Sequence, residues 1–252
     1  MKRTGIFILL WLNLSGLFAQ EHRLDSLFAS ANEAYRQGNY ALAEKNYKKI
    51  LSYGYHAADL YYNLGNTAYK QNNIPLAIYY YEKALRLNPD LKEARDNLAL
   101  VKNSLQDKIK PLPVSPLSAF WHRIVRLMSP SSWGVTALFT LLLSLVFFDL
   151  YLFSRTGGYK RLFFILMLIA FMVSAFDFAA GYTAHREQLR KWGIVFVPEA
   201  DLYAGPAMSS GKTGKVHEGL KVEITGSMDD WYQIKLPDGN TAWIPRKVLK
   251  PI

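Results

Sequence analysis

The 252-residue sequence contains no cysteine, which excludes disulfides, thiolate metal sites and a cysteine nucleophile. Its histidines are scattered without metal-ligand spacing, at His22, His56, His122, His185 and His217. A Gly-rich phosphate loop ending in Lys-Ser/Thr, a Gly-x-Ser-x-Gly elbow and a His-Glu-x-x-His pair are also absent. These absences predict a protein without catalytic residues, a cofactor or a metal site.

Charged residues are almost missing from two stretches in the middle of the chain. Val135–Phe153 and Leu162–Ala180 are 19 residues long and hold one charged residue each, Asp149 and Asp177. At a rise of about 1.5 Å per residue, a helix over either stretch matches the thickness of the hydrocarbon core of a bilayer. We therefore predict a transmembrane hairpin with residues 154–161 as its loop, which places the chain before it and the chain after it in one compartment.

The two membrane aspartates lie near opposite ends of this predicted hairpin. Asp149 is four residues from the loop end of its span, and Asp177 is three residues from the outer end of its own. In a straight hairpin they differ in depth by about 16 Å, so they cannot pair with each other. Two interpretations stay open: solvation near the interface, or pairing with an Arg or Lys in a partner's membrane helix.

Excess positive charge is concentrated beside these stretches. The net charge is +10, and residues 117–193 hold eight basic against three acidic residues, whereas residues 194–252 hold seven of each. Lys and Arg that flank a membrane span meet lipid headgroups. The basic character therefore does not predict nucleic acid binding.

The first 19 residues have the pattern of a signal peptide. Lys2 and Arg3 precede an apolar run that ends at Phe18, and Ala19 stands before polar sequence. An uncleaved anchor is the alternative. Either one exports the residues that follow, which leaves the loop at residues 154–161 in the cytoplasm.

A 34-residue period runs through the chain before the hairpin. The positions that repeat are Ala31, Gly65 and Ala99; Ala43 and Ala77; Tyr35 and Tyr69; and Tyr47 and Tyr81. Small residues let antiparallel helices approach closely, and aromatic residues fill the gaps beside them. The pattern resembles tetratricopeptide (TPR) repeats. It predicts an all-α solenoid over residues 20–107, with repeats at 24–57 and 58–91, helices near 24–37, 40–53, 58–71 and 74–87, and a capping helix at 92–106.

The first helix of each predicted repeat contributes to a concave face. The residues projected onto it are Asn32, Tyr35, Asn63, Asn66, Tyr69 and Asn97. Because an asparagine side chain both donates and accepts hydrogen bonds, these residues are candidates for holding an extended peptide. The alternative is that the asparagines only solvate the groove. Phe28 and Tyr62 stand at positions where carboxylate-clamping TPR domains carry lysine, so we do not expect that mode of binding.

A stiff linker and an amphipathic segment lead into the hairpin. Residues 108–117 contain three prolines within six positions, which favours an extended linker. Residues 118–128 place Phe120 and Trp121 on an apolar face and Arg123 and Arg126 on the other. This pattern predicts a helix lying in the membrane interface, and packing on the repeat unit is the alternative.

The chain after the hairpin changes to a hydropathy period of two. Apolar and polar residues alternate before and after a predicted hairpin turn at Pro237–Asn240. Short strands over residues 194–252 predict a small all-β barrel, and the segment resembles bacterial SH3-like domains. That resemblance implies binding of peptides or cell-wall glycopeptide. The candidates for a ligand face are Tyr203, Trp231 and Trp243, and the alternative is that these rings only close the barrel.

The order of signal peptide, TPR unit, membrane hairpin and SH3-like domain resembles the BatE family of the bacterial aerotolerance operon. The resemblance implies an inner-membrane protein with both modules in the periplasm and a role in envelope stress. It also implies von Willebrand A-domain membrane proteins, a second TPR protein and a MoxR-type ATPase as partners. Three functions stay open: a non-enzymatic scaffold, a peptidoglycan-binding sensor or anchor, and a membrane enzyme subunit that uses Asp149 or Asp177.

Overall fold

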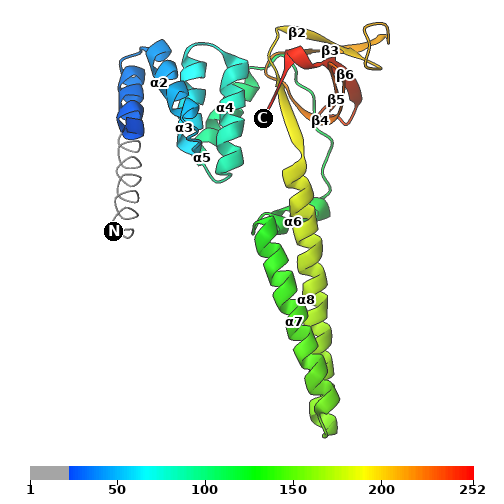
Figure 1. Cartoon of the computed structure of the whole chain (residues 1–252). Coiled ribbons are helices and arrows are strands. Elements are labelled where there is room, and N and C mark those ends of the chain that lie inside the picture. Colours follow the sequence, from blue (N-terminus) through cyan, green and yellow to red (C-terminus); the bar gives the residue numbers. More distant parts are fainter. Residues whose placement is uncertain (1–22) are drawn as a thin grey trace, which may run out of the picture. The chain divides into compact units, whose positions relative to one another are not determined.

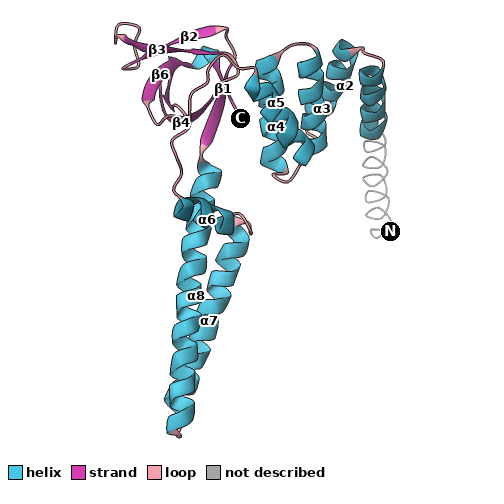
Figure 2. Cartoon of the chain, turned by 180° about the vertical axis from the view of Figure 1, so that it is seen from behind, coloured by secondary structure: helices cyan, strands magenta, loops and turns pink. Residues whose placement is uncertain are grey.

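The computed structural model describes residues 23–252, so the predicted signal peptide at residues 1–19 lies outside the described residues. Contacts divide the chain into two units (Figures 1 and 2). One unit joins the residues up to Lys110 with Lys191–Ile252, and the other is Pro111–Arg190. The two ends of the chain that flank the apolar helices thus belong to one unit.

The N-terminal part is an array of antiparallel helices. It consists of a helix at residues 23–36, α2 (Tyr40–Ser52), α3 (Ala58–Lys70), α4 (Ile74–Leu87) and α5 (Lys92–Asn103). Asn39 and Asn73 cap α2 and α4, because each side-chain oxygen accepts a hydrogen bond from a backbone N–H three residues later, at 3.2 Å. The first four of these helices begin and end within one residue of the positions expected from the repeat.

The repeated small residues allow these helices to pack closely. Ala31, Ala43 and Ala77 are fully buried, and a Cβ added to Gly65 would lie 2.6 Å from the ring of Tyr81. Ala99, the next residue in the Gly65 series, is exposed, because no helix of a third pair covers α5 in the described chain. The 34-residue pattern therefore reports helix–helix contacts.

The C-terminal part is an antiparallel all-β domain. Its seven strands are β1 (Lys191–Val195), β2 (Glu199–Tyr203), β3 (Lys212–His217), β4 (Lys221–Met228), β5 (Trp231–Lys235), β6 (Thr241–Pro245) and β7 (Leu249–Pro251). They pair in the order β3-β2-β6-β5-β4-β1-β7. The domain starts three residues before the predicted boundary at 194, since β1 begins at Lys191 and pairs with both β4 and β7.

Alternation along the strands builds the core of this domain. Val222, Ile234 and Ile244 are buried on one face of the sheet. The predicted turn joins β5 to β6, where the Leu236 N–H donates to the Asn240 carbonyl at 2.8 Å and Gly239 has a φ of +92°. A positive φ at this position suits glycine, so the local sequence explains the hairpin.

The second unit contains α6 (Pro116–Val125), α7 (Pro130–Phe153) and α8 (Gly157–Leu189). Both α7 and α8 are long and apolar enough to cross a membrane, judged by length and composition. They extend beyond the apolar stretches because α7 starts from a Ser129 cap and Pro130, and α8 already includes Lys160 and Arg161. The connection between the helices is therefore residues 154–156, shorter than the predicted loop at 154–161.

Small residues form the contact between α7 and α8. The Ser174 hydroxyl donates to the Ala137 carbonyl at 2.8 Å, and the Ser144 hydroxyl donates to the Met167 carbonyl at 3.1 Å. A Cβ added to Gly181 would lie 3.0 Å from Cβ of Trp133. Small side chains and interhelical hydrogen bonds of this kind hold helices together in lipid, where the hydrophobic effect does not.

Candidate functional site

Asparagine and tyrosine side chains form a hydrogen-bonded ladder in the helical array. The Asn32 side-chain oxygen accepts from the Tyr47 hydroxyl at 2.6 Å and from Asn63 Nδ2 at 3.5 Å. One repeat later, the Asn66 oxygen accepts from the Tyr81 hydroxyl at 2.7 Å and from Asn97 Nδ2 at 2.9 Å. The four candidate asparagines thus lie together, and their first role is to bind one another and the core tyrosines.

The tyrosines of this ladder are the residues that the sequence did not single out as partners. Tyr47 and Tyr81 each follow their asparagine by 15 residues, so the repeat itself carried that signal. Burial raises the pKa of Tyr47 to about 12, and burial also raises the pKa of Tyr81. Both hydroxyls therefore stay protonated at neutral pH and can donate to the asparagine oxygens.

A cavity of about 160 Å³ lies beside the second step of the ladder. It is lined by Tyr35, Asn66, Tyr69, Lys70, Tyr81, Asn97, Leu100 and Val101. Four of the six groove candidates are in this set, whereas Asn32 and Asn63 lie on the preceding step. The exposed sides of Tyr69, Lys70 and Leu100 add an aromatic ring, a cation and an apolar contact. Such a surface can hold an extended peptide with one acidic group.

Lys70 and Leu100 were not among the sequence candidates. Lys70 had a signal in the repeat, because Arg36 stands 34 residues before it with the same charge. Leu100 had none, since its repeat counterpart is Asn66. Its exposed position became visible only once α5 was seen to end the helical array.

The three aromatic candidates of the β domain lie on one face of the sheet. Tyr203 in β2 is paired in register with Trp243 in β6, and its ring meets that of Trp231 edge to face at 5.2 Å. Tyr203 is only 6% exposed, whereas Trp231 and Trp243 are partly exposed. The two tryptophans can therefore contact a ligand, and Tyr203 supports Trp231 from below.

A buried carboxylate joins the helical array to the β domain. Glu82 in α4 is 9% exposed and accepts from Lys102 of α5 at 2.8 Å and from Lys221 of β4 at 2.6 Å. Burial alone would raise the pKa of Glu82, but the two ammonium groups outweigh it and hold that pKa below its ordinary value. Lys221 also lies 4.7 Å above the ring of Trp192.

The segment after α5 continues the same contact. The Asp107 carboxylate accepts from the His217 backbone N–H at 2.6 Å and contacts His217 Nδ1 at 2.7 Å. Leu105 lies so close to Gly219 that an added Cβ would be 2.5 Å from its side chain. Arg86 donates to the Ile252 carbonyl at 2.6 Å. Helices and strands more than 100 residues apart in sequence thus form one packed unit.

The structure separates the two membrane aspartates. Asp149 is exposed on α7, whereas Asp177 is 7% exposed on the face of α8 that meets α7. A helix approaching from outside the hairpin can therefore reach Asp149 but not Asp177. Of the two predicted candidates for pairing with a partner, only Asp149 has the required position.

The amphipathic segment packs on the hairpin. Trp133 Nε1 donates to the Val125 carbonyl at 3.0 Å, and the Trp121 ring meets Phe176 edge to face at 5.5 Å. His122 Nδ1 contacts the Glu187 carboxylate. On the opposite side of α6, Leu117 and Phe120 are 78% and 59% exposed. This arrangement fixes α6 at one end of the hairpin and leaves an apolar face open.

These parts define a pair of recognition modules in one unit, joined to a two-helix segment that is consistent with a membrane anchor. Among residues 23–252, no group of three or more His, Cys, Asp or Glu side chains is placed to hold a metal ion. Residues 28–92 match the family model for the tetratricopeptide repeat, and residues 198–250 match the model for the bacterial SH3 domain. No curated protein matches the chain. TPR and SH3-like modules both point to binding functions.

Proposed function

We propose that this protein is a non-enzymatic scaffold of the bacterial inner membrane, with its TPR and SH3-like modules in the periplasm. The observation that carries the proposal is the Glu82 contact with Lys102 and Lys221, which makes both modules parts of one unit. Because the hairpin lies between them in sequence, a single packed unit requires both of its ends to be on the same side of the membrane. Two modules held together raise the effective concentration of a shared partner.

The partners that we propose are von Willebrand A-domain membrane proteins and a second TPR protein, acting in aerotolerance or envelope stress. The groove beside the asparagine ladder would hold an extended segment of one partner. The exposed Asp149 supports a second contact, within the membrane, with a basic residue of a partner helix. No catalytic step is part of this proposal.

Purification from native membranes after cross-linking tests the proposal. The variant Tyr69→Ala with Leu100→Ala removes two exposed groove side chains, which are 39% and 58% exposed. The matched control is Tyr53→Ala with Leu87→Ala, because these side chains are 39% and 52% exposed outside the groove. We expect the groove variant to lose membrane-protein partners, identified by mass, that the control retains. An identical set of partners for both variants would contradict the scaffold function of the groove.

Binding of peptidoglycan is a second candidate function, favoured by the aromatic face of the SH3-like module. Partly exposed tryptophans beside each other are suited to stacking on sugar rings or peptide. The test is sedimentation of the full chain in nanodiscs with purified peptidoglycan. We expect Trp231→Ala to reduce the sedimented fraction if this function is present. Absence of sedimentation for the unmodified chain would remove the candidate.

A further inference from the structure

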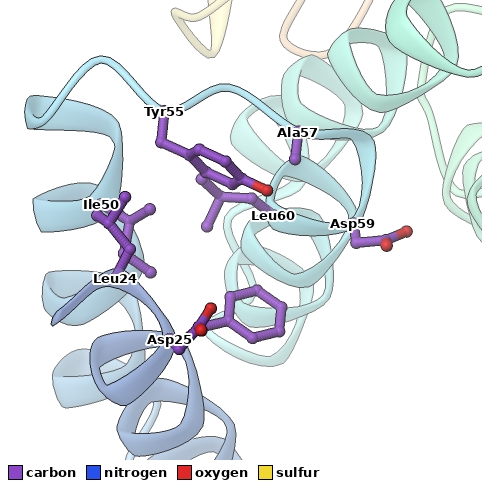
Figure 3. A pocket seen from close by; sticks show the side chains of 8 residues that line it. Leu24, Asp25, Ile50, Tyr55, Ala57, Asp59 and Leu60 are labelled. Carbon is purple, nitrogen blue, oxygen red and sulfur yellow. The ribbon is translucent and has the colours of Figure 1, made fainter. Parts of the chain in front are cut away.

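A second cavity opens near the N-terminal edge of the TPR module. It has a volume of about 290 Å³ and lies between the helix at residues 23–36, α2, α3 and the loop that joins them. Its lining residues are Leu24, Asp25, Phe28, Ile50, Tyr55, Ala57, Asp59 and Leu60 (Figure 3). None of these residues lines the groove cavity, so the two cavities are separate sites.

The floor of this cavity is apolar. Leu60 and Ile50 are buried at 0% and 1% exposure, and Leu24 and Phe28 pack beside them as partly buried side chains. Tyr55 is 50% exposed and extends over the opening from the loop before α3. Pockets for whole small molecules measure about 300 to 1,000 Å³, so this volume suits one or two side chains of a peptide.

The rim of the cavity carries two carboxylates. Asp25 and Asp59 are 34 residues apart, at equivalent positions of the two repeats, and both are exposed. Figure 3 shows them on different helices around the same opening. Within the described residues, neither forms a salt bridge with Lys, Arg or His. Position in a first helical turn stabilises an acidic residue such as Asp59, but it does not require two such residues to line one cavity.

We propose that this cavity binds an extended segment of a protein partner in which an apolar side chain stands next to Lys or Arg. The apolar side chain enters over Leu60 and Ile50, and the flanking cation lies between Asp25 and Asp59. The proposal adds a partner chemistry to the scaffold function at a site outside the groove. Its failure would leave the groove and its partners untouched.

Fluorescence anisotropy with the full chain in nanodiscs tests this site. The probe is a labelled, end-blocked peptide with the order glycine, lysine, leucine, lysine, glycine. Comparison peptides replace both lysines by glutamate, or the leucine by glycine. We expect the lysine–leucine peptide to bind most tightly and to weaken at high salt, because exposed charges are screened. Equal binding of the glutamate peptide would overturn the proposal.

Two variants separate the contributions of charge and cavity. Asp25→Asn with Asp59→Asn should weaken binding about fivefold, from two exposed charge contacts. Its control, Glu93→Gln with Glu218→Gln, makes the same change in net charge, and Glu93 is also a first-turn acidic residue at the repeat-equivalent position, outside the cavity. Ala57→Leu fills the cavity without changing charge and should also weaken binding. An equal loss for the control, or unchanged binding in both cavity variants, would contradict the proposed site.

Discussion

Glu82 is the residue on which the contact between the two modules depends most. Taking a carboxylate out of water is costly unless cations and hydrogen bonds compensate for it, and here Lys102 and Lys221 supply both. The two lysine side chains are 40% and 27% exposed, so water screens part of their attraction. The pair is therefore a specific connection between modules more than a large source of stability.

Removal of the Glu82 carboxylate should loosen this connection. We expect Glu82→Ala to lower the free energy of unfolding by about 1–3 kcal/mol, because two partly buried cations lose their acceptor. Hydrogen exchange should then increase in both β4 and α5. The control is Asp96→Asn, which breaks an exposed pair with Lys92 and should change stability by less than about 0.5 kcal/mol. Equal effects of both variants would show that Glu82 does not join the modules.

The same residue predicts a dependence on acid pH. The pKa of Glu82 is lower in the folded chain than its ordinary value of 4.5, so the unfolded chain binds the proton more readily. The stabilisation is therefore present above about pH 4.5 and is lost as the pH falls through the folded-state pKa. Thermal unfolding followed from pH 7 to pH 3 should show a smaller acid-induced loss for Glu82→Gln. A parallel loss in both chains would count against this role.

Gly65 shows how one small residue sets the distance between helices. Its missing side chain leaves room for the Tyr81 ring, and overpacking of such a contact costs about 1–3 kcal/mol. We expect Gly65→Ala to lower the melting temperature. Ala99→Leu, at the equivalent repeat position but exposed, serves as the control and should have little effect. A stable Gly65→Ala variant would contradict the packing account.

At the scale of elements, the tyrosine–asparagine ladder links α2 and α4 to the first helices of the repeats. The folded-state pKa of Tyr47 is about 12, above the ordinary value of 10.0. Its contribution to stability is therefore complete below pH 10 and is lost as the pH rises through 12. Absorbance of ionised tyrosine should increase for exposed rings first and for Tyr47 only as the helices unfold. Titration of every tyrosine near pH 10 in a folded chain would contradict the burial of the ladder.

The small α6 helix depends on one indole for its position. Trp133→Phe keeps the aromatic contact but removes the hydrogen bond from Nε1 to the Val125 carbonyl, which is worth about 1 kcal/mol. We expect faster hydrogen exchange in α6 and unchanged exchange in α7 and α8. Trp121→Phe is the control, because no hydrogen bond of its indole is part of this contact. Unchanged exchange in α6 would show that α6 is held by other contacts.

Local patterns were sufficient to predict most elements. Ala31, Gly65, Asn39 and Asn73 report helix contacts and caps between neighbours in sequence, and Gly239 reports a hairpin turn. Contacts between distant segments were not predictable in the same way. Nothing local to Glu82 indicates that Lys221, 139 residues later, is its partner, and nothing in an apolar stretch indicates which face of α8 carries Asp177 inward. The candidate asparagines were found, but their bonds to tyrosine were not.

At the scale of the whole molecule, the account makes one claim about the membrane. The chain before the hairpin and the chain after it form a single unit, so both must lie on one side, where they can bind a shared partner. Because the sequence contains no cysteine, single cysteines can be introduced as reporters without removing native ones. Suitable exposed positions are Ala29 in the TPR module, Glu218 in the SH3-like module and Arg155 in the connection between α7 and α8.

Labelling of these single-cysteine variants with a membrane-impermeant maleimide, in vesicles of known orientation, tests the claim most directly. The account predicts that Ala29→Cys and Glu218→Cys react from the periplasmic side and Arg155→Cys from the cytoplasmic side. Reaction of Ala29→Cys and Glu218→Cys from opposite sides of the membrane would contradict it.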